Sequence, residues 1–208
     1  MIDDTFDAIA DLPWPQKGDV LFANAEDWYH NACLNWRYDN WELYASGYKT
    51  AGDVLVQHVI DTRSERDILV FPIVFNYRQY IELRCKEIIR LGRMLSDMPG
   101  AFPQHHDLQK LWSVCRKIIS DCEPGASKSD FEAIDELIAQ FCAVDAKSEN
   151  FRYPVDRAGN PAISDALPVI NLRQLRDVMN RLASFLDGVS MAFSVYIDNR
   201  AEMQGYGW

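Results

Sequence analysis

Apolar residues recur at every third or fourth position in at least five segments of the chain, which is the spacing of amphipathic α-helices. The first series spans residues 28–62 and breaks around 38–40, so it predicts two helices or one bent helix. The second series predicts a helix that begins near Pro72, because proline is tolerated in the first turn, and that ends at 91 or 95. Residues 67–71, just before it, could form a short strand.

Three more helices are expected in the second half of the chain. An apolar stripe over 108–119 predicts one of them, and the capping box formed by Ser129 and Glu132 marks the start of the next. Residues 148–170 contain three prolines and a glycine and predict a long irregular loop, a kind of loop that tends to be functional or mobile. Asn171 then caps the last and longest helix. The fold class is therefore all-α, a bundle of five to six helices with a long irregular loop before the last helix.

The length of 208 residues suits a single domain, but the first 23 residues lack a helical period. They contain two prolines and a glycine and predict an irregular acidic arm over 1–23 that wraps one helical-bundle domain over 24–208. Residues 1–30 hold one base against seven acids, a net charge of −6 out of the total of −10. Because the remaining residues carry only −4, the bundle can still have a local basic surface.

No apolar run approaches the roughly 18 residues that cross a membrane, and the N-terminus does not resemble a signal peptide. We therefore expect a cytoplasmic protein without membrane contact. The five cysteines show no CxxC or other close pairing, so no metal site is expected, and Cys85, Cys115 and Cys142 fall on apolar stripes as buried thiols. P-loop, GxGxxG, GxSxG and HExxH motifs do not occur, so we expect no cofactor.

Two neighbouring helices carry the most informative residues. In the first, Glu82 precedes Lys86 by four positions and Gly92 follows, and the second helix opens with His106-Asp107-Leu108. This pair, over residues 77–112, is similar to the central helix pair of the HEPN superfamily of helical bundles. The stretch 151–159 resembles that of uncharacterised bacterial HEPN-like proteins.

This resemblance implies a four- to five-helix bundle that usually forms a dimer and is common in bacterial toxin–antitoxin and phage-defence systems. Active members cleave RNA without a metal, and their pattern is an arginine followed after four to six residues by a histidine near the start of the final helix. The sequence departs from that pattern, because its last helix has no histidine and no arginine precedes any histidine at that spacing. The four histidines are His30, His58, His105 and His106.

The missing motif favours a divergent, non-catalytic HEPN-like protein that acts by binding protein or RNA, as a homodimer or with a partner protein, in a bacterial defence or toxin–antitoxin type assembly. Two alternatives stay open. One is a metal-independent ribonuclease whose displaced catalytic site combines Arg78, Glu82 and His105 or His106 in one polar cleft, with or without Arg152 of the long loop. The other is a helical protein whose similarity to HEPN is convergent.

The polar line on the helix that holds Glu82 has a simpler interpretation as a solvated face, formed by Gln79, Glu82, Lys86 and Arg90. His106 beside Asp107 can likewise be explained by hydrogen bonding at a helix start.

The long loop supplies the candidate binding residues. Arg152, Tyr153 and Arg157, with Asp156 between them, could contact phosphates or a partner protein, since arginine offers planar bidentate donors, or they could be merely solvated. A run of aromatic residues is expected to lie in the core or in a dimer interface rather than to stack on bases. Its members are Trp28, Tyr29, Trp36, Tyr38, Trp41, Tyr44 and Tyr48.

Overall fold

The computed structural model of the chain describes residues 13–34, 40–123, 125, 128–156 and 158–205. The chain divides into two units, Met1–Tyr38 and Asp39–Trp208. The division therefore lies fifteen positions after residue 23, where the sequence placed the end of the acidic arm.

The described part of the first unit contains one short 3-10 helix, η1 (Trp28–His30), in place of the longer helix predicted there. The rings of Trp28 and Tyr29 stack at 4.0 Å between centroids, and both side chains are exposed. Tyr44, in the second unit, is exposed as well, so the expectation of core positions is wrong for these three aromatic residues. Their role as an interface stays a prediction, and Trp36 and Tyr38 lie outside the described residues.

The described residues of the second unit form five α-helices, which confirms the all-α bundle. They are α2 (Trp41–Thr62), α3 (Arg66–Leu95), α4 (Leu108–Cys122), α5 (Lys128–Asp145) and α6 (Leu172–Gly205). The described residues form no strand, and their one β-type contact is an isolated bridge between Val155 and Pro161 in the long loop.

Helix α3 begins at Arg66, so the start near Pro72 and the strand over 67–71 are both wrong. The connection from α2 is only three residues long, because Arg63 and Glu65 both adopt left-handed backbone angles (φ 55° and 58°) that reverse the chain at once. Pro72 consequently lies inside the helix. An interior proline removes one backbone hydrogen bond and crowds the carbonyl four residues earlier, so packing of the helix against its neighbours must offset that cost.

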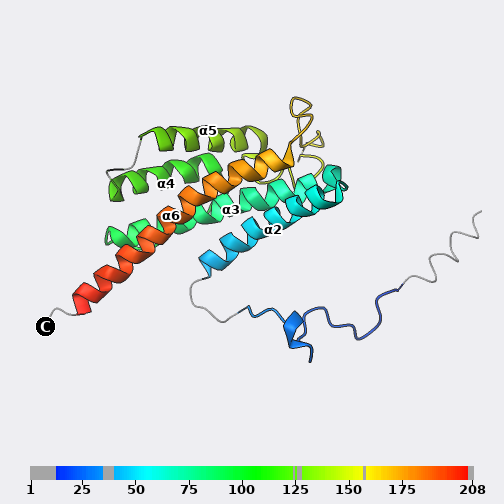
Figure 1. Ribbon diagram of the computed structural model, residues 1–208, viewed down its shortest axis with the longest axis horizontal. Helices are drawn as coiled ribbons and strands as arrows, with labels where there is room; N and C mark the ends of the chain where they lie inside the picture. Colours follow the sequence, from blue (N-terminus) through cyan, green and yellow to red (C-terminus); the bar gives the residue numbers. More distant parts are fainter. Residues whose placement is uncertain (1–12, 35–39, 124, 126–127, 157, 206–208) are drawn as a thin grey trace, which may run out of the picture. The chain divides into compact units, whose positions relative to one another are not determined.

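Helix α3 lies in the middle of the bundle, with α2 on one side, α4 and α5 on the other, and α6 crossing it (Figure 1). Half of its 30 residues are buried, and they face every direction around the helix. The interpretation of its polar line as a solvated face is therefore wrong, because Glu82 and Lys86 are 1% and 6% exposed.

Contacts along α3 give the direction of its neighbours. The hydroxyl of Tyr77 donates to Asp53 of α2 at 2.8 Å, and Tyr80 donates to Asp187 of α6 at 2.6 Å. Further along α3, Arg84 reaches back to Glu42 at the start of α2. Helix α2 thus runs antiparallel to α3, whereas α6 runs in the same direction as α3 (Figure 1).

Helices α3 and α4 also run in the same direction, so the chain between them returns along α3. We call this segment, residues 96–107, the strap. Arg93 donates to the carbonyl of Ala101 at 2.7 Å, and the ring of Phe102 lies 5.9 Å from the Lys86 ammonium group. The strap ends at Asp107, whose carboxylate accepts from the backbone N–H of Lys110 and caps α4.

The start of α6 is capped in the same way, because Asn171 Oδ1 accepts from the backbone N–H of Gln174 at 3.0 Å. Helix α5 begins at Lys128, one residue before the predicted Ser129.

Cys85 and Cys115 are fully buried, as predicted, whereas Cys142 is half-buried.

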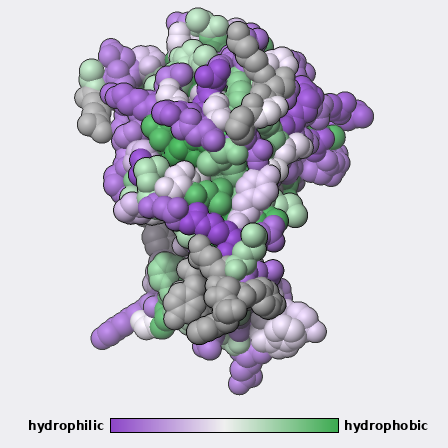
Figure 2. Space-filling view, turned by 90° about the vertical axis from the view of Figure 1, so that its left-hand side faces the viewer, coloured by the Kyte–Doolittle hydropathy of each residue, from purple (hydrophilic) through white to green (hydrophobic). Residues whose placement is uncertain are grey.

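In the described part of the chain, none of the helices is both long and apolar enough to cross a bilayer. Figure 2 shows the side that lies at the left of Figure 1, where polar side chains cover most of the surface and apolar ones gather in smaller patches.

Close packing at Gly92 joins α3 to both α4 and α6. A Cβ atom at this position would collide with Ile118 Cγ2 of α4 and come within 3.1 Å of the Phe193 ring of α6. Gly188 of α6 is the opposite case, because a Cβ atom there would meet nothing within 4 Å.

Replacing Gly92 by Ala should lower the free energy of unfolding by about 1–3 kcal/mol, since overpacking outweighs the gain in helix propensity. The control, Gly188→Ala, should raise it by up to about 1 kcal/mol. Urea unfolding followed by circular dichroism measures both changes. Equal effects of the two substitutions would contradict the packing seen at Gly92.

Candidate functional site

The structure brings together three of the four residues proposed for a displaced ribonuclease site. Glu82 accepts from Arg78 Nη1 at 2.8 Å through one carboxylate oxygen, and its other oxygen lies 2.7 Å from His106 Nδ1. Lys86, which sequence reasoning assigned to a solvated line, donates to that second oxygen at 2.8 Å. We call these four residues the Glu82 network. His105 does not join it, and its side chain is exposed.

Arg78 is fully buried, and the bundle uses its donors for structure. Its Nε donates to the carbonyl of Asp145 at 3.3 Å, and its Nη2 donates to the carbonyls of His106 at 2.6 Å and Ala146 at 3.3 Å. With the bond to Glu82, the guanidinium connects α3, the end of the strap and the end of α5. Satisfying the last carbonyls of a helix is a structural role that arginine often fills.

Glu82 is ionised despite its burial. Burial alone raises the pKa of this carboxyl group, but hydrogen bonds from Lys86, Arg78 and His106 outweigh it and hold the pKa below its usual value. The Glu82 carboxylate thus supplies the one acidic side chain of the network and lies between the basic side chains of Arg78 and Lys86.

His106 is the solvent-facing member of the network. Its side chain is 67% exposed while Glu82 beside it is 1% exposed. With Nδ1 against Glu82, its Nε2 edge faces outward, an arrangement that can orient a histidine for proton transfer. The network therefore offers one accessible acid-base group, whereas its arginine cannot reach a phosphate at the surface.

A second ionic network lies on the other side of α3 and was not predicted from the sequence. Its centre is Arg84. Arg84 is 1% exposed and contacts Glu87 at 2.6 Å, Glu42 at 2.5 Å and Asp187 at 2.9 Å. Burial raises the pKa of Glu87, and the attraction of Arg84 only partly offsets it. One feature of the sequence could have indicated this network, because Arg84 interrupts the apolar side of α3.

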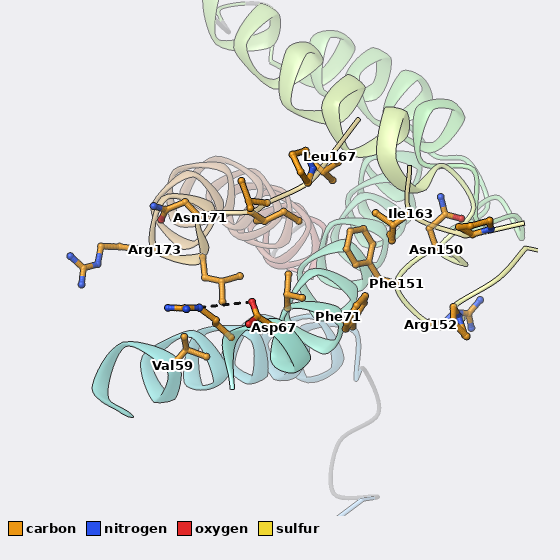
Figure 3. A pocket seen from close by; sticks show the side chains of 18 of the residues that line it. Val59, Asp67, Phe71, Asn150, Phe151, Arg152, Ile163, Leu167, Asn171 and Arg173 are labelled. Atoms are coloured by element: carbon orange, nitrogen blue, oxygen red, sulfur yellow. Dashed lines mark ion pairs between the residues drawn. The ribbon is translucent and has the colours of Figure 1, made fainter. Parts of the chain in front are cut away.

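An open hollow of the bundle lies elsewhere, between the end of α2, the start of α3, the long loop and the start of α6 (Figure 3). It is an open groove of about 1160 Å³. Its floor is apolar, and the rings of Phe71 and Phe151 lie 6.5 Å apart within it. We call it the arginine groove, because its lining includes Arg63, Arg66, Arg152 and Arg173.

All four arginines are exposed, and Asp67, 3.8 Å from Arg66, is the one acid among the described lining residues. In Figure 3, Arg173 lies at one side of the groove and Arg152 at the other, with Phe71 and Phe151 between them. The lining thus carries a net charge of +3 in a chain whose total charge is −10. This local reversal of charge is the basic surface that the charge distribution left open.

The loop residues proposed for binding lie partly in this groove. Arg152 and Tyr153 line it, whereas Arg157 lies outside the described residues. The Arg152 guanidinium donates from Nε to the carbonyl of Ser148 at 2.5 Å and lies 5.8 Å from the ring of Phe75, so the bundle holds it in place. Tyr153 remains 57% exposed beside it. Sequence reasoning missed Arg63, Arg66 and Arg173, because they come from separate segments, namely the turn after α2, the start of α3 and the start of α6.

A metal has no evident site in the part of the chain that the structure describes, where His, Cys, Asp and Glu form no group of three that could hold one. Comparisons with family models, with curated proteins and with solved structures find no match to this chain. The similarity of residues 77–112 to HEPN domains therefore stays a prediction.

Replacing Arg78 by Met should lower the free energy of unfolding by about 3–5 kcal/mol, because the Glu82 carboxylate would remain buried without one of its two cationic partners. Exchanging both Arg78 and Glu82 for Met should cost less than the sum of the single changes. The control, Arg181→Met on the exposed side of α6, should change stability by no more than about 0.5 kcal/mol. Additive costs in the double variant, measured by urea unfolding, would show that the two side chains do not interact.

The two buried glutamates should give stability opposite dependences on pH. The lowered pKa of Glu82 stabilises the fold above the unfolded value near 4.5, and this contribution disappears as pH falls through the folded pKa. The raised pKa of Glu87 destabilises the fold once the group ionises. From pH 4 to 7, Glu82→Gln should lose stability relative to wild type, and Glu87→Gln should gain it. Thermal unfolding across this range measures both slopes, and slopes of the same sign would refute the assignment.

Proposed function

We propose that this chain is a divergent, non-catalytic HEPN-like protein that acts by binding an anionic partner in the arginine groove. The observation that carries the proposal is the closed environment of Arg78. This arginine would have to stabilise phosphate charge in a displaced ribonuclease site, yet it is 0% exposed and bonded to Glu82 and three backbone carbonyls.

Metal-free cleavage of RNA by this chemistry needs a cationic side chain that stabilises the negative charge developing on the phosphoryl oxygens in the transition state. Moving Arg78 to the surface would remove one partner of the buried Glu82 carboxylate and the donor that Arg78 gives to the last carbonyl of α5, at a cost of several kcal/mol. The geometry therefore supports a structural role for Arg78 and Glu82.

The arginine groove supports the binding role. Exposed guanidinium groups offer bidentate donors to carboxylates or phosphates, and they surround a floor that contains Phe71, which is 44% exposed. A partly exposed apolar floor favours a protein segment with both acidic and apolar side chains, since RNA backbone would leave that floor uncovered. The resemblance to HEPN domains places such binding in a bacterial defence or toxin–antitoxin type assembly, with a homodimer or a partner protein.

One observation favours a second candidate, a weak ribonuclease. The exposed His106 paired with buried Glu82 has the form of an acid-base dyad. A ribonuclease would also need an accessible cation, and the network offers none, because Lys86 is buried and already bonded to Glu82.

Equimolar amounts of the purified protein should leave a labelled single-stranded RNA intact, because the network presents no cation to the phosphate. Gel electrophoresis of the RNA measures this. His58 is a matched control, since it lies 2.7 Å from Glu65 in a similar exposed histidine and glutamate pair. Cleavage that disappears in His106→Ala and persists in His58→Ala would refute the non-catalytic assignment and establish the dyad.

A further inference from the structure

The cations of the arginine groove lie on two sides of an apolar floor. In Figure 3, Arg173 of α6 lies at one side and Arg152 of the long loop at the other, with Phe71 and Phe151 between them. Phe71 is 44% exposed, so part of this floor is open to an occupant. A complementary occupant must therefore carry acids along two edges and apolar side chains in the middle.

Arg152 supplies a fixed cation on the loop side of the groove. Its Nε donates to the carbonyl of Ser148 at 2.5 Å, and its guanidinium lies 5.8 Å from the Phe75 ring and 5.5 Å from the Tyr153 ring. With Nε engaged, Nη1 and Nη2 are the donors that a ligand can use. A guanidinium that is already held loses less conformational entropy when it pairs with a carboxylate, so this side favours a bidentate acidic contact.

The loop wall of the groove offers few backbone donors to an extended partner. The backbone N–H groups of Arg152 and Tyr153 both donate to the carbonyl of Glu149 at 3.1 Å. Three more residues of this wall are prolines, which have no N–H group, namely Pro154, Pro161 and Pro168. An extended segment would leave much of its own backbone without partners on this side. A helical segment has no such requirement, because its backbone hydrogen bonds lie within the helix.

The volume of the groove also suits a helix. Two turns of an α-helix, roughly 10 Å across and 11 Å long, occupy about 850 Å³. The groove measures about 1160 Å³, so two turns fit within it. Over two turns, a helix places the side chains at i, i+4 and i+7 on one face and can carry acids on either side of that face.

We propose that the anionic partner of the arginine groove is an amphipathic α-helix with acidic residues along both edges of an apolar stripe. The inference rests on the proposed binding role of the groove and names the class of partner. The stripe covers Phe71 and the neighbouring floor, while one acidic edge pairs with Arg152 and the other with Arg173. A basic helix, or a helix with one acidic edge, lacks at least one of these sets of contacts.

The experiment measures the binding of short designed helices to the full chain by fluorescence anisotropy. Each peptide carries fluorescein and is held helical by a hydrocarbon staple on its outward face. The reference peptide has a leucine stripe flanked by glutamates on both edges, and a permuted peptide of the same composition distributes the leucines around the helix. The reference should bind at least roughly tenfold more tightly, because only its leucines can be buried together on the floor.

Two further peptides replace the glutamates of one edge or of the other by glutamine. Each should lose affinity for the wild type by roughly threefold or more, because each edge meets its own arginine. With Arg173→Glu in the protein, one of the two replacements should lose its effect and the other should keep it. Arg152→Glu should show the reverse pattern. The control Arg181→Glu, an exposed arginine outside the groove, should preserve both effects.

Equal affinity of the reference and permuted peptides would overturn the inference, as would sensitivity to only one acidic edge in the wild type. An unstapled peptide, in which prolines replace outward-facing residues of the reference and prevent a helix, separates the two proposals. If it binds as tightly as the reference and Arg173→Glu weakens both, the helical partner is refuted and the binding role stands. If none of the acidic peptides binds, both proposals fail.

Discussion

The buried carboxylate of Glu82 is the interaction on which the arrangement of α3, α4 and α5 depends. An ionised group inside a protein is tolerated only when it is paired and hydrogen-bonded, and Glu82 achieves this with Arg78, Lys86 and His106. Because Arg78 also bonds the carbonyls that end the strap and α5, the same charge fixes where both segments meet α3. Such networks specify one packing register at the expense of alternatives, since every other register would leave a charge unpaired.

The position of α3 explains why the bundle needs two such networks. Residues 78, 82 and 86 are spaced four apart and face α5 and the strap, whereas Tyr80, Arg84 and Glu87 face α2 and α6. A helix enclosed on all sides would ordinarily be apolar throughout. Here the polar residues on both sides pair with residues of each neighbouring segment, so α3 organises the bundle through specific bonds as well as through its apolar contacts.

The helices could be predicted from the sequence where an apolar stripe and a cap agree, as at Asp107 and Asn171. The start of α3 could not be predicted, because Pro72 indicated a first helical turn. The left-handed positions of the preceding turn are occupied by Arg63 and Glu65, and not by the glycine that would have marked them in the sequence. The convergence of Arg78, Glu82 and His106 was anticipated as a hypothesis, but their burial was not. An amphipathic pattern shows which residues are polar and does not show whether a strap covers them. The arginine groove was unpredictable for a related reason, since its lining comes from segments more than 100 residues apart.

The shared direction of α3 and α6 has a consequence for how the chain acquires its fold. Residues of α3 contact partners in α6 that follow 105 to 107 positions later, as in the pairs of Tyr80 with Asp187 and Leu95 with Arg200. Contacts over such separations slow folding relative to an up-and-down bundle of the same size. During synthesis, the side of α3 that packs against α6 stays exposed to solvent until α6 has left the ribosome. The buried arginine on that side, Arg84, keeps the waiting surface partly polar and so less prone to aggregation.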